Sequence, residues 1–501
     1  MSTAQTMEKK GSYGILIILM VGAFIAILNS TLLNIALPSI TKDLGIETST
    51  VQWLTTGYML VNGIMIPTTA FLIRKYSVRN LFLTAMLLFS IGTIIAGVAE
   101  VFPLLLGARM VQAAGSAIMM PLLMNVLLTS FPVEKRGSAM GLFGLVMMFA
   151  PAIGPTLSGW IIEHYDWRML FHFITPLALL VLVFGFFKLR DHKEKVDIHI
   201  DKISVILSSL GFGGLLYGFS SAGSKGWDSP WVYGTLFVGA ISLVLFITRQ
   251  LKMETPMLEF KIFQHPMFAL SATISIVLNM AMFSGMILIP MYTQTVRGIS
   301  PFDSGLLMLP GALLMAFMSP VTGKLFDKFG ARILASIGLL ITVVTTYYLS
   351  KLSMETTYTH IIILFSIRSF GMSMSMMPIM TNGLNSLPAR MNPHGTAMNN
   401  TLNQISGAIG TALLVTVMSN RAASSAEELM TKAMSKLTSQ PTAEMMGQMK
   451  AQIGTQAMLD GINFSFLVST FIAAVALILT VFIKRAWPAE EKPVEKKKQT
   501  A

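Results

Sequence analysis

The stretch PVTGKLFDKFGAR occupies residues 320–332, and a related stretch, PTTAFLIRKYSVR, occupies residues 67–79. Both run from a proline to an arginine across a short basic loop between two long apolar segments. Two more pairs follow in the same order: an arginine that precedes Met-Met-Pro (109 and 368), and the tetrapeptides GSAM (137–140) and GTAM (395–398). The copies are 253 to 259 residues apart, so the sequence predicts two related halves that run in parallel.

The composition indicates that most of the chain avoids water. Hydrophobic residues make up 53% and charged residues 12% of the 501 residues, whereas soluble domains carry roughly 25% charged residues. The apolar runs are about 20 residues long, which is the length that a helix needs to cross a bilayer. They do not alternate as the strands of a membrane barrel would. Helices satisfy their own backbone hydrogen bonds in lipid, so we expect the spans to be helical.

The apolar runs predict fourteen spans. Their expected ranges are 14–37, 51–72, 80–98, 102–128, 137–162, 168–188, 203–222, 230–250, 267–293, 302–323, 331–350, 358–385, 396–419 and 462–484. The repeat pairs the first six spans with the last six, which leaves the seventh and eighth as an insertion. The predicted fold class is therefore an all-α polytopic membrane protein with two six-helix bundles and two inserted central helices.

These spans divide the chain into four parts. Residues 1–188 form the N-terminal bundle, 189–266 hold two linkers and the extra helices, 267–485 form the C-terminal bundle, and 486–501 form a basic tail. Within the third part, residues 421–460 have Met, Leu and Ala at helical spacing, in runs too short to span. We expect an external helical hairpin there.

The basic residues decide the orientation. Of the 36 lysines and arginines, 25 fall in tails and loops on the side of the termini, nine on the other side and two inside spans. Cytoplasmic loops carry such an excess, so we expect a multi-pass protein of the cell membrane with both termini in the cytoplasm. The net charge of +12 is spread over these loops, which argues against a nucleic-acid partner. With no cysteine, a disulfide framework and a thiolate metal site are excluded.

Two arginines lie inside predicted spans, Arg109 about eight residues into the fourth and Arg368 about ten residues into the twelfth. A charge at that depth is costly, so such a residue usually faces a cavity or pairs with another group. The alternative is a structural arginine that bonds backbone carbonyls. For Arg109 the functional interpretation is favoured, and for Arg368 the two are evenly matched.

The fifth span contains APAIGPTLSG at residues 150–159. Glycine lets helices approach closely, and proline removes one backbone hydrogen bond and kinks the helix. Gly154, Pro155 and Gly159 are therefore candidates for a gate or hinge, with an ordinary kinked helix as the alternative.

Polar and methionine side chains within the spans indicate a substrate cavity. Polar groups in hydrocarbon are expected to face partners or a cavity, and methionine suits a promiscuous apolar pocket. The alternative for any single methionine is packing or lipid contact. The candidate cavity residues are Asn29, Asn34, Gln112, Met120, Met148, Arg368, Asn400 and Gln404.

Several of these motifs resemble one family. RMVQAAGSA at residues 109–117 is similar to the span-four motif of the major facilitator superfamily, and the segment at 150–159 resembles its antiporter motif. GKLFDKFGAR at 323–332 is similar to its Gly-x-x-x-Asp-x-x-Gly-x-Arg loop signature. The segments NSTLLNIALP (29–38), DWRMLFHF (166–173) and GTAMNNTLNQISGAIG (395–410) resemble the fourteen-span drug:proton antiporters, especially the lincomycin-resistance-like branch.

The resemblance implies export of drugs or amphiphiles against proton entry, by rocking of the two halves of a major facilitator fold. By position, Arg109 would influence proton transfer, and Gly154 and Pro155 would shape the gate. Asp327 with Arg332, in the loop signature that also holds Gly323 and Gly330, would form a cytoplasmic latch. The N-terminal copy of this signature is degenerate, because Arg74 stands at the position of the aspartate. Its latch is expected to work differently or to be weak.

A second departure concerns proton coupling. Many members of the resembled family carry an aspartate in span one, where this chain has Asn29, and an amide cannot carry a proton near neutral pH. No Asp or Glu lies in the middle of a predicted span. The nearest are Glu100 and Asp303 at span ends, which join Arg109 as candidates for coupling. A solvated helix-end acid is the alternative for both, and Asp303 could equally cap its helix.

The sequence favours a secondary exporter of drugs or other amphiphilic small molecules, with a dedicated exporter of an endogenous lipid, peptide or nucleotide signal as the alternative. Neither a P-loop nor a hydrolase or metalloprotease motif is present, so we expect neither an enzyme nor an ATP-driven pump. The expected energy source is the proton gradient, with no cofactor and no metal. The expected partners are small amphiphilic substrates and the lipid bilayer, and no obligatory protein partner is evident.

Overall fold

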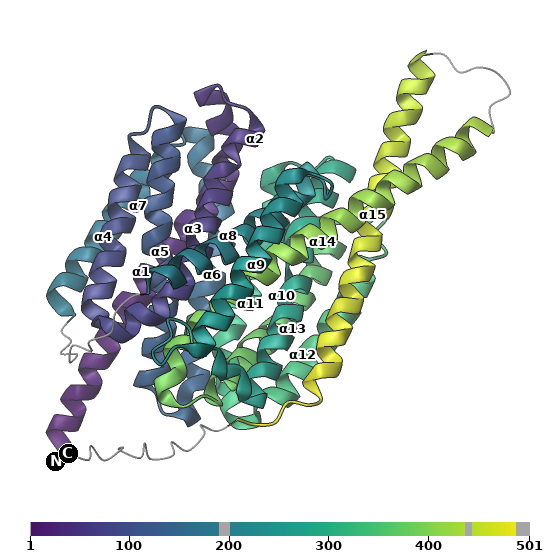
Figure 1. Ribbon diagram of the computed structural model, residues 1–501. Helices are drawn as coiled ribbons and strands as arrows, with labels where there is room; N and C mark the ends of the chain where they lie inside the picture. The colour runs from purple at the N-terminus through teal and green to yellow at the C-terminus, as the bar shows by residue number, and fades with distance from the viewer. Residues whose placement is uncertain (1, 190–200, 436–442, 487–501) are drawn as a thin grey trace.

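The computed structural model describes residues 2–189, 201–435 and 443–486. Throughout these ranges the regular secondary structure is helical, and fourteen helices are long and apolar enough to cross a membrane. Figure 1 shows them as two groups of roughly aligned helices. The predicted all-α polytopic fold with fourteen spans is confirmed.

The helices follow the predicted repeat. The N-terminal half contains α1 (Ser2–Leu44), α3 (Trp53–Lys75), α4 (Val78–Gly97), α5 (Phe102–Ser130), α6 (Arg136–His164) and α7 (Met169–Lys188). The insertion contains α8 (Lys202–Lys225) and α9 (Pro230–Lys252). The C-terminal half contains α10 (Pro266–Met291), α11 (Pro301–Phe329), α12 (Ala331–Leu349), α13 (Tyr358–Asn385), α14 (Asn392–Ser435) and α15 (Ala443–Thr480). Short helical segments are α2 (Thr48–Val51), η1 (Val133–Lys135), η2 (Phe260–Gln264), η3 (Tyr292–Val296) and η4 (Ala389–Met391).

The helix bundle has two ends, which we call the terminal face and the hairpin face. The terminal face is the end at which α1 begins and α15 ends, and the hairpin face is the opposite end (Figure 1). Because consecutive spans alternate in direction, α6 and α14 begin at the terminal face, whereas α5 and α11 end there.

Local chemistry marks the helix ends. Side-chain oxygens of Ser77, Asp201, Ser300 and Thr357 accept hydrogen bonds from backbone N–H groups in the first turns of α4, α8, α11 and α13, as N-caps do. Gly330 separates α11 from α12 with a φ of 77°, a conformation that side chains with a Cβ rarely adopt. The loop signature therefore makes a sharp turn at this glycine.

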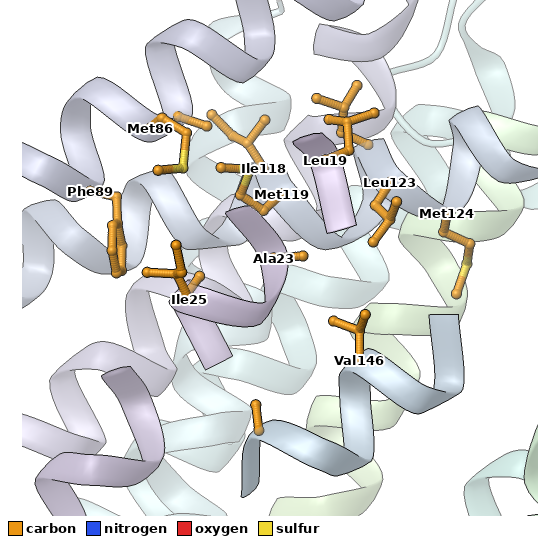
Figure 2. Close-up of a cluster of buried hydrophobic side chains, with 14 of the residues drawn as sticks. Leu19, Ala23, Ile25, Met86, Phe89, Ile118, Met119, Leu123, Met124 and Val146 are labelled. Atoms are coloured by element: carbon orange, nitrogen blue, oxygen red, sulfur yellow. The ribbon is translucent and has the colours of Figure 1, made fainter. Parts of the chain in front are cut away.

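The N-terminal half has a continuous apolar core. Figure 2 shows Leu19 and Ala23 of α1 near Ile118 and Met119 of α5, with Met86 and Phe89 of α4 at one side. All of these are at most 4% exposed. This core places α1 among α4, α5 and α6, so that residues in the middle of α1 and α5 are shielded from the surroundings.

The two halves meet along two seams. At the first seam α6 packs antiparallel against α11, and glycines allow a close approach: a Cβ on Gly141 would lie 2.7 Å from the Ser319 carbonyl oxygen. At the second seam α3 meets α14, and the inserted helix α8 contacts both. Trp53 of α3 stacks on Tyr217 of α8, with ring centroids 5.7 Å apart. The insertion therefore bridges the two halves at the second seam.

The hairpin expected at residues 421–460 is built from the ends of two long helices. α14 continues to Ser435 and α15 begins at Ala443, and residues 436–442 between them lie outside the described ranges. Figure 1 shows both helices projecting beyond the rest of the bundle. The last span is thus the second half of a 38-residue helix.

Candidate functional site

A buried polar network lies inside the N-terminal half, where α1, α4 and α5 meet. Gln112 Oε1 accepts hydrogen bonds from Arg109 Nη1 (2.8 Å) and Asn29 Nδ2 (3.3 Å). Gln112 Nε2 donates to Thr93 Oγ1 (2.8 Å). The Arg109 guanidinium also lies 4.2 Å from the centroid of the Tyr58 ring on α3, a cation–π contact. The network therefore ties four helices of this half together through one arginine and one amide.

Arg368 occupies the corresponding place in the C-terminal half. Its Nη2 donates to the Ala281 carbonyl oxygen (2.7 Å) and to Ser284 Oγ (3.1 Å) on α10. Its Nε donates to Thr346 Oγ1 (3.1 Å) on α12. These bonds are the contacts that a structural arginine makes, and the side chain is 3% exposed.

Neither arginine forms an ion pair with a carboxylate among the described residues. Arg109 and Arg368 are each held by neutral oxygens, and Arg109 additionally by an aromatic ring. Burying an unpaired charge is costly. Each half therefore keeps a buried cation whose contacts are with uncharged groups.

The first seam is closed at the terminal face by Asp327, near the end of α11. Its Oδ1 accepts from the backbone N–H of Gly137 (2.9 Å). Its Oδ2 accepts from the backbone N–H (2.9 Å) and the Oγ (2.6 Å) of Ser138. A carboxylate at a helix N-terminus is stabilised by the free N–H groups and by the helix dipole. We call these three residues the latch.

The other residues of the loop signature support the latch in different ways. Gly323 lies against the backbone of Gly137 on α6, where a Cβ would not fit. Gly330 makes the turn described above. Arg332 is exposed at the start of α12, and the hydrogen bonds of the latch do not include it. Arg485 donates instead to the Asp327 carbonyl oxygen (2.8 Å).

The glycines of the α6 motif contact different neighbours. A Cβ on Gly154 would lie 2.9 Å from Thr31 Cβ on α1, so this glycine allows close packing inside the N-terminal half. A Cβ on Gly159 would lie 3.2 Å from the ring of Phe302 on α11, across the first seam. Pro155 lies within α6, and its side chain is outside the described part.

The DWR segment before α7 forms an ion-pair cluster at the hairpin face. Arg168 Nη1 lies 2.9 Å from Asp43 Oδ2 and 3.2 Å from Asp166 Oδ1. Trp167 Nε1 donates to Asp43 Oδ2 (3.0 Å). The hydrogen bonds from Trp167 and then Arg168 hold the pKa of the Asp43 carboxyl below its usual value. This cluster ties the end of α1 to the start of α7.

A pocket lies between the two halves, nearer the terminal face. It is lined by seven methionines, three from the N-terminal half and four from the C-terminal half, and by Asn400 and Asn403 of α14. The full set is Met124, Phe143, Gly144, Met147, Met148, Met315, Ser319, Ser373, Met376, Met377, Met380, Asn400 and Asn403. None of these side chains is ionisable. The cavity volume is about 30 Å³, far below the 300–1,000 Å³ of a drug-sized site, so the halves are closed around it.

Two of the eight predicted cavity residues, Met148 and Asn400, line this pocket. Asn29, Gln112 and Arg368 lie in the buried networks inside the halves instead. Met120 on α5 and Gln404 on α14 are partly buried and do not line it. The side chain of Asn34 lies outside the described residues.

The two acidic candidates for coupling are exposed and belong to different halves. Glu100 lies in the connection between α4 and α5. Asp303 lies in the first turn of α11, where its backbone N–H donates to Ser300 Oγ (3.0 Å) and Oδ2 accepts from the same hydroxyl (2.7 Å). Arg109, the third candidate, is buried inside α5, and the structure shows no contact between it and either acid. No group of three or more His, Asp or Glu within the described ranges could hold a metal ion.

Sequence reasoning missed several lining residues that share helix faces with residues it found. Asn403 lies one turn after Asn400, and Gly144 lies one turn before Met148. Because residues three and four apart lie on one face of a helix, this spacing was the available signal. Asn403 also accepts a hydrogen bond from Asn279 Nδ2 on α10 (2.9 Å), which orients its amide.

Comparison with known proteins agrees with this architecture. The family model described as Major Facilitator Superfamily matches residues 19–411. The "Uncharacterized MFS-type transporter YhcA" of Bacillus subtilis is 46% identical, with 100% of this chain and 97% of that protein covered. The "Lincomycin resistance protein LmrB" of the same organism is 42% identical, with 97% and 98% covered.

A solved structure resembles the chain in fold. The human organic anion transporter MFSD10 superposes with a TM-score of 0.62 at 13% identity, with 92% of this chain and 99% of that chain covered. At this identity the likeness concerns the arrangement of helices alone.

Proposed function

The chain belongs to the major facilitator superfamily, and on that basis we propose that it is a secondary active exporter of drugs or other amphiphilic small molecules. It is a membrane transporter and not an enzyme. The relative named for lincomycin resistance aligns over almost its whole length at 42% identity, which supports export of antibiotics or molecules like them.

The pocket between the halves is the observation that carries this proposal. Its walls come from five helices, two of the N-terminal half and three of the C-terminal half, so rocking of the halves would open and close it. Methionine side chains are flexible and polarisable and can adapt to ligands of different shape. The two asparagines and two serines can form hydrogen bonds, and no lining side chain ionises. These walls favour uncharged or zwitterionic amphiphiles over strong cations.

We further propose that the terminal face is cytoplasmic and that the protein lies in the cell membrane. The excess of lysine and arginine in the connections on that face supports this orientation. The latch then closes the path to the cytoplasm, and the structure corresponds to a state in which substrate cannot enter from that side.

Proton antiport is the proposed energy source, with no bound cofactor and no obligatory protein partner. The support for antiport is the chain's membership of the family. The structure adds none, because no carboxylate within the described residues pairs with Arg109 or Arg368 inside the spans. The proton path is therefore expected to use groups near the ends of the spans, among which Glu100 and Asp303 are candidates.

Purified protein in proteoliposomes tests the proposal. With a proton gradient imposed and an amphiphilic antibiotic added, we expect drug accumulation that is accompanied by a change of internal pH. Drug movement without proton flux would overturn the coupling while export would stand. Absence of movement for neutral, zwitterionic and cationic amphiphiles alike would overturn the exporter proposal.

A further inference from the structure

The second seam has its own contact at the terminal face, related to the latch by the internal repeat. In the internal repeat, Arg74 near the end of α3 corresponds to Asp327 of α11. His394 at the start of α14 corresponds to Arg136 at the start of α6. Arg74 Nη1 lies 3.3 Å from His394 Nε2. The carboxylate of the latch is thus replaced by a cation, which cannot accept hydrogen bonds from the N–H groups at the start of α14.

A third segment completes this contact. Glu259, in the linker that follows α9, donates its backbone N–H to His394 Nδ1 (3.2 Å). Gln250 at the end of α9 shapes that linker, because its Oε1 accepts from the backbone N–H groups of Met257 (2.7 Å) and Leu258 (3.2 Å). His394 therefore joins α3 of one half, α14 of the other and the linker of the inserted helices.

Both ring nitrogens of His394 face groups that can only donate. A guanidinium has no acceptor, and neither has a backbone N–H. A neutral imidazole has one lone pair, so it can accept from one of the two neighbours. A protonated imidazolium has none, and it would place a second positive charge beside Arg74 while its ring is 4% exposed.

Among the described residues, Arg74 is the charged side chain that acts on the ring, and no negative group faces it. The Glu259 carboxylate is turned away, and its Oε1 accepts from the backbone N–H of Lys261 (3.3 Å). Arg390, one turn before His394, is exposed and positive. The first turn of α14 presents the positive end of its helix dipole, where cations are unfavourable. Within the part of the chain that the structure describes, the titratable residues that contact the ring are Arg74, through its side chain, and Glu259, through its backbone.

We propose that His394 is a proton-binding switch that opens the second seam from the terminal face. The closed seam accepts only the neutral ring, so a proton binds more tightly once the seam has opened and the ring is hydrated. By linkage, a fall of pH on that face shifts the population toward the open form. The latch at the first seam contains no histidine and lacks this response.

Distance measurements across the second seam test this switch. The chain has no cysteine, so Asn80→Cys and Arg390→Cys, both at exposed positions of opposite halves, can carry spin labels without background. We measure the distance between the two labels in the full-length protein in nanodiscs. The fraction of molecules with the longer distance should rise several-fold from pH 8 to pH 6. Asp327→Asn in the same background should raise that population at both pH values and shows that the labels report opening.

Three variants then assign the response. His394→Gln keeps an acceptor for Arg74 but cannot titrate, so the pH response should disappear. His265→Gln, at the start of α10 near the same face, is the matched control and should leave it intact. Arg74→Gln removes the like charge and should reduce the response, which keeps the test available if His394→Gln fails to fold. A pH response that persists unchanged in His394→Gln or in Arg74→Gln would overturn the proposal. So would a parent protein whose long-distance population does not change with pH, although Asp327→Asn raises that population.

Discussion

Asp327 accepts two hydrogen bonds from Ser138, one from the backbone N–H (2.9 Å) and one from the hydroxyl (2.6 Å). The two residues are 189 positions apart and belong to opposite halves. Their contact places a carboxylate at the start of α6, where the unpaired N–H groups of a helix favour an anion. One side chain of α11 thereby closes the first seam at the terminal face.

Asp327→Asn should weaken this closure. An amide has one acceptor oxygen in place of two and no charge, so at least one bond of the latch is lost. A hydrogen bond to a charged group contributes about 1.5–3 kcal/mol, so the ratio of closed to open protein should fall by about tenfold or more. The readout is the rate at which a polar maleimide modifies Ser319→Cys, which is buried in the pocket of the closed form.

The matched control for this variant is Lys328→Gln, one residue further along α11. Lys328 is exposed and lies over the Phe329 ring, outside the latch. It should leave the maleimide rate unchanged. Equal rates in parent and Asp327→Asn would show that the latch does not hold the first seam.

Gly141→Ala should force the first seam apart. A Cβ there would lie 2.7 Å from the Ser319 carbonyl oxygen and 2.9 Å from Pro320 Cα, and backbone atoms of α11 cannot move aside as a side chain could. Overpacking of this kind costs about 1–3 kcal/mol, so transport and thermal stability should both fall. Gly234→Ala in α9 is the control, because its Cβ meets nothing within 4 Å. It should be neutral or slightly stabilising, since alanine favours a helix. Equal behaviour of the two variants would contradict close packing at Gly141.

The sequence predicted the helices well because hydrophobic length alone defines a membrane span. The twelfth span, expected at 358–385, is observed as Tyr358–Asn385. The ends of α14 and α15 beyond the membrane could not be placed in this way. Residues 421–435 are polar enough to leave the hydrocarbon, yet they contain neither glycine nor proline, so nothing in them ends the helix.

The polar site was less predictable, because its geometry depends on which helices meet. The polar character of Asn29 and Gln112 within spans predicts that they line a cavity, whereas tertiary packing pairs them with each other inside one half. Asn400 lies on the face of α14 that meets the pocket. Sequence pattern gives the polar residues of a span, whereas their partners lie on other helices, 83 positions away in the case of Asn29 and Gln112. The replacement at Arg74 was visible as a departure, but its contact with His394 needed the structure.

Asn400→Asp should change which substrates are exported. The substitution adds a carboxylate to a pocket that has no ionisable side chain, and aspartate has nearly the same shape as asparagine. Attraction between opposite charges is strong where water is scarce, so efflux of a quaternary ammonium dye should rise several-fold relative to that of a neutral drug. Asn420→Asp, exposed beyond the span, is the control and should change neither. Unaltered selectivity in Asn400→Asp would argue that substrates do not use this pocket.

Arg368→Ala should destabilise the C-terminal half. It removes three hydrogen bonds and leaves the Ala281 carbonyl oxygen, Ser284 and Thr346 without this donor. Ser284 keeps its bonds with Ala281 and Ser469. Because hydrogen bonds to a charged group contribute about 1.5–3 kcal/mol, the unfolding temperature in detergent should still fall by several degrees. Arg332→Ala, exposed on α12, should shift it little. A parent-like unfolding temperature in Arg368→Ala would remove the structural role assigned to this arginine.

The ion pair between Asp201 and Arg249, which joins the start of α8 to the end of α9, should depend on pH. Arg249 donates to the Asp201 carboxylate through Nε (2.6 Å) and Nη2 (3.1 Å), and the Ser204 hydroxyl donates as well (2.5 Å). The bond from Arg249, and then those from Ser204, hold the pKa of Asp201 well below its usual value despite partial burial. The unfolded carboxyl titrates near pH 4. The ion pair therefore contributes fully above about pH 4 and progressively less as the pH falls toward the folded pKa.

Asp201→Asn keeps the N-cap of α8 but loses the charge. Because Arg249 is partly exposed and water screens its attraction to Asp201, we expect a modest loss of stability at pH 7. The difference in unfolding temperature between parent and variant, measured in detergent at pH 7 and pH 3, should shrink at the lower pH, because the parent itself loses this contribution there. A difference that stays constant between the two pH values would mean that the variant acts through packing or capping and that the charge of Asp201 does not hold α8 to α9.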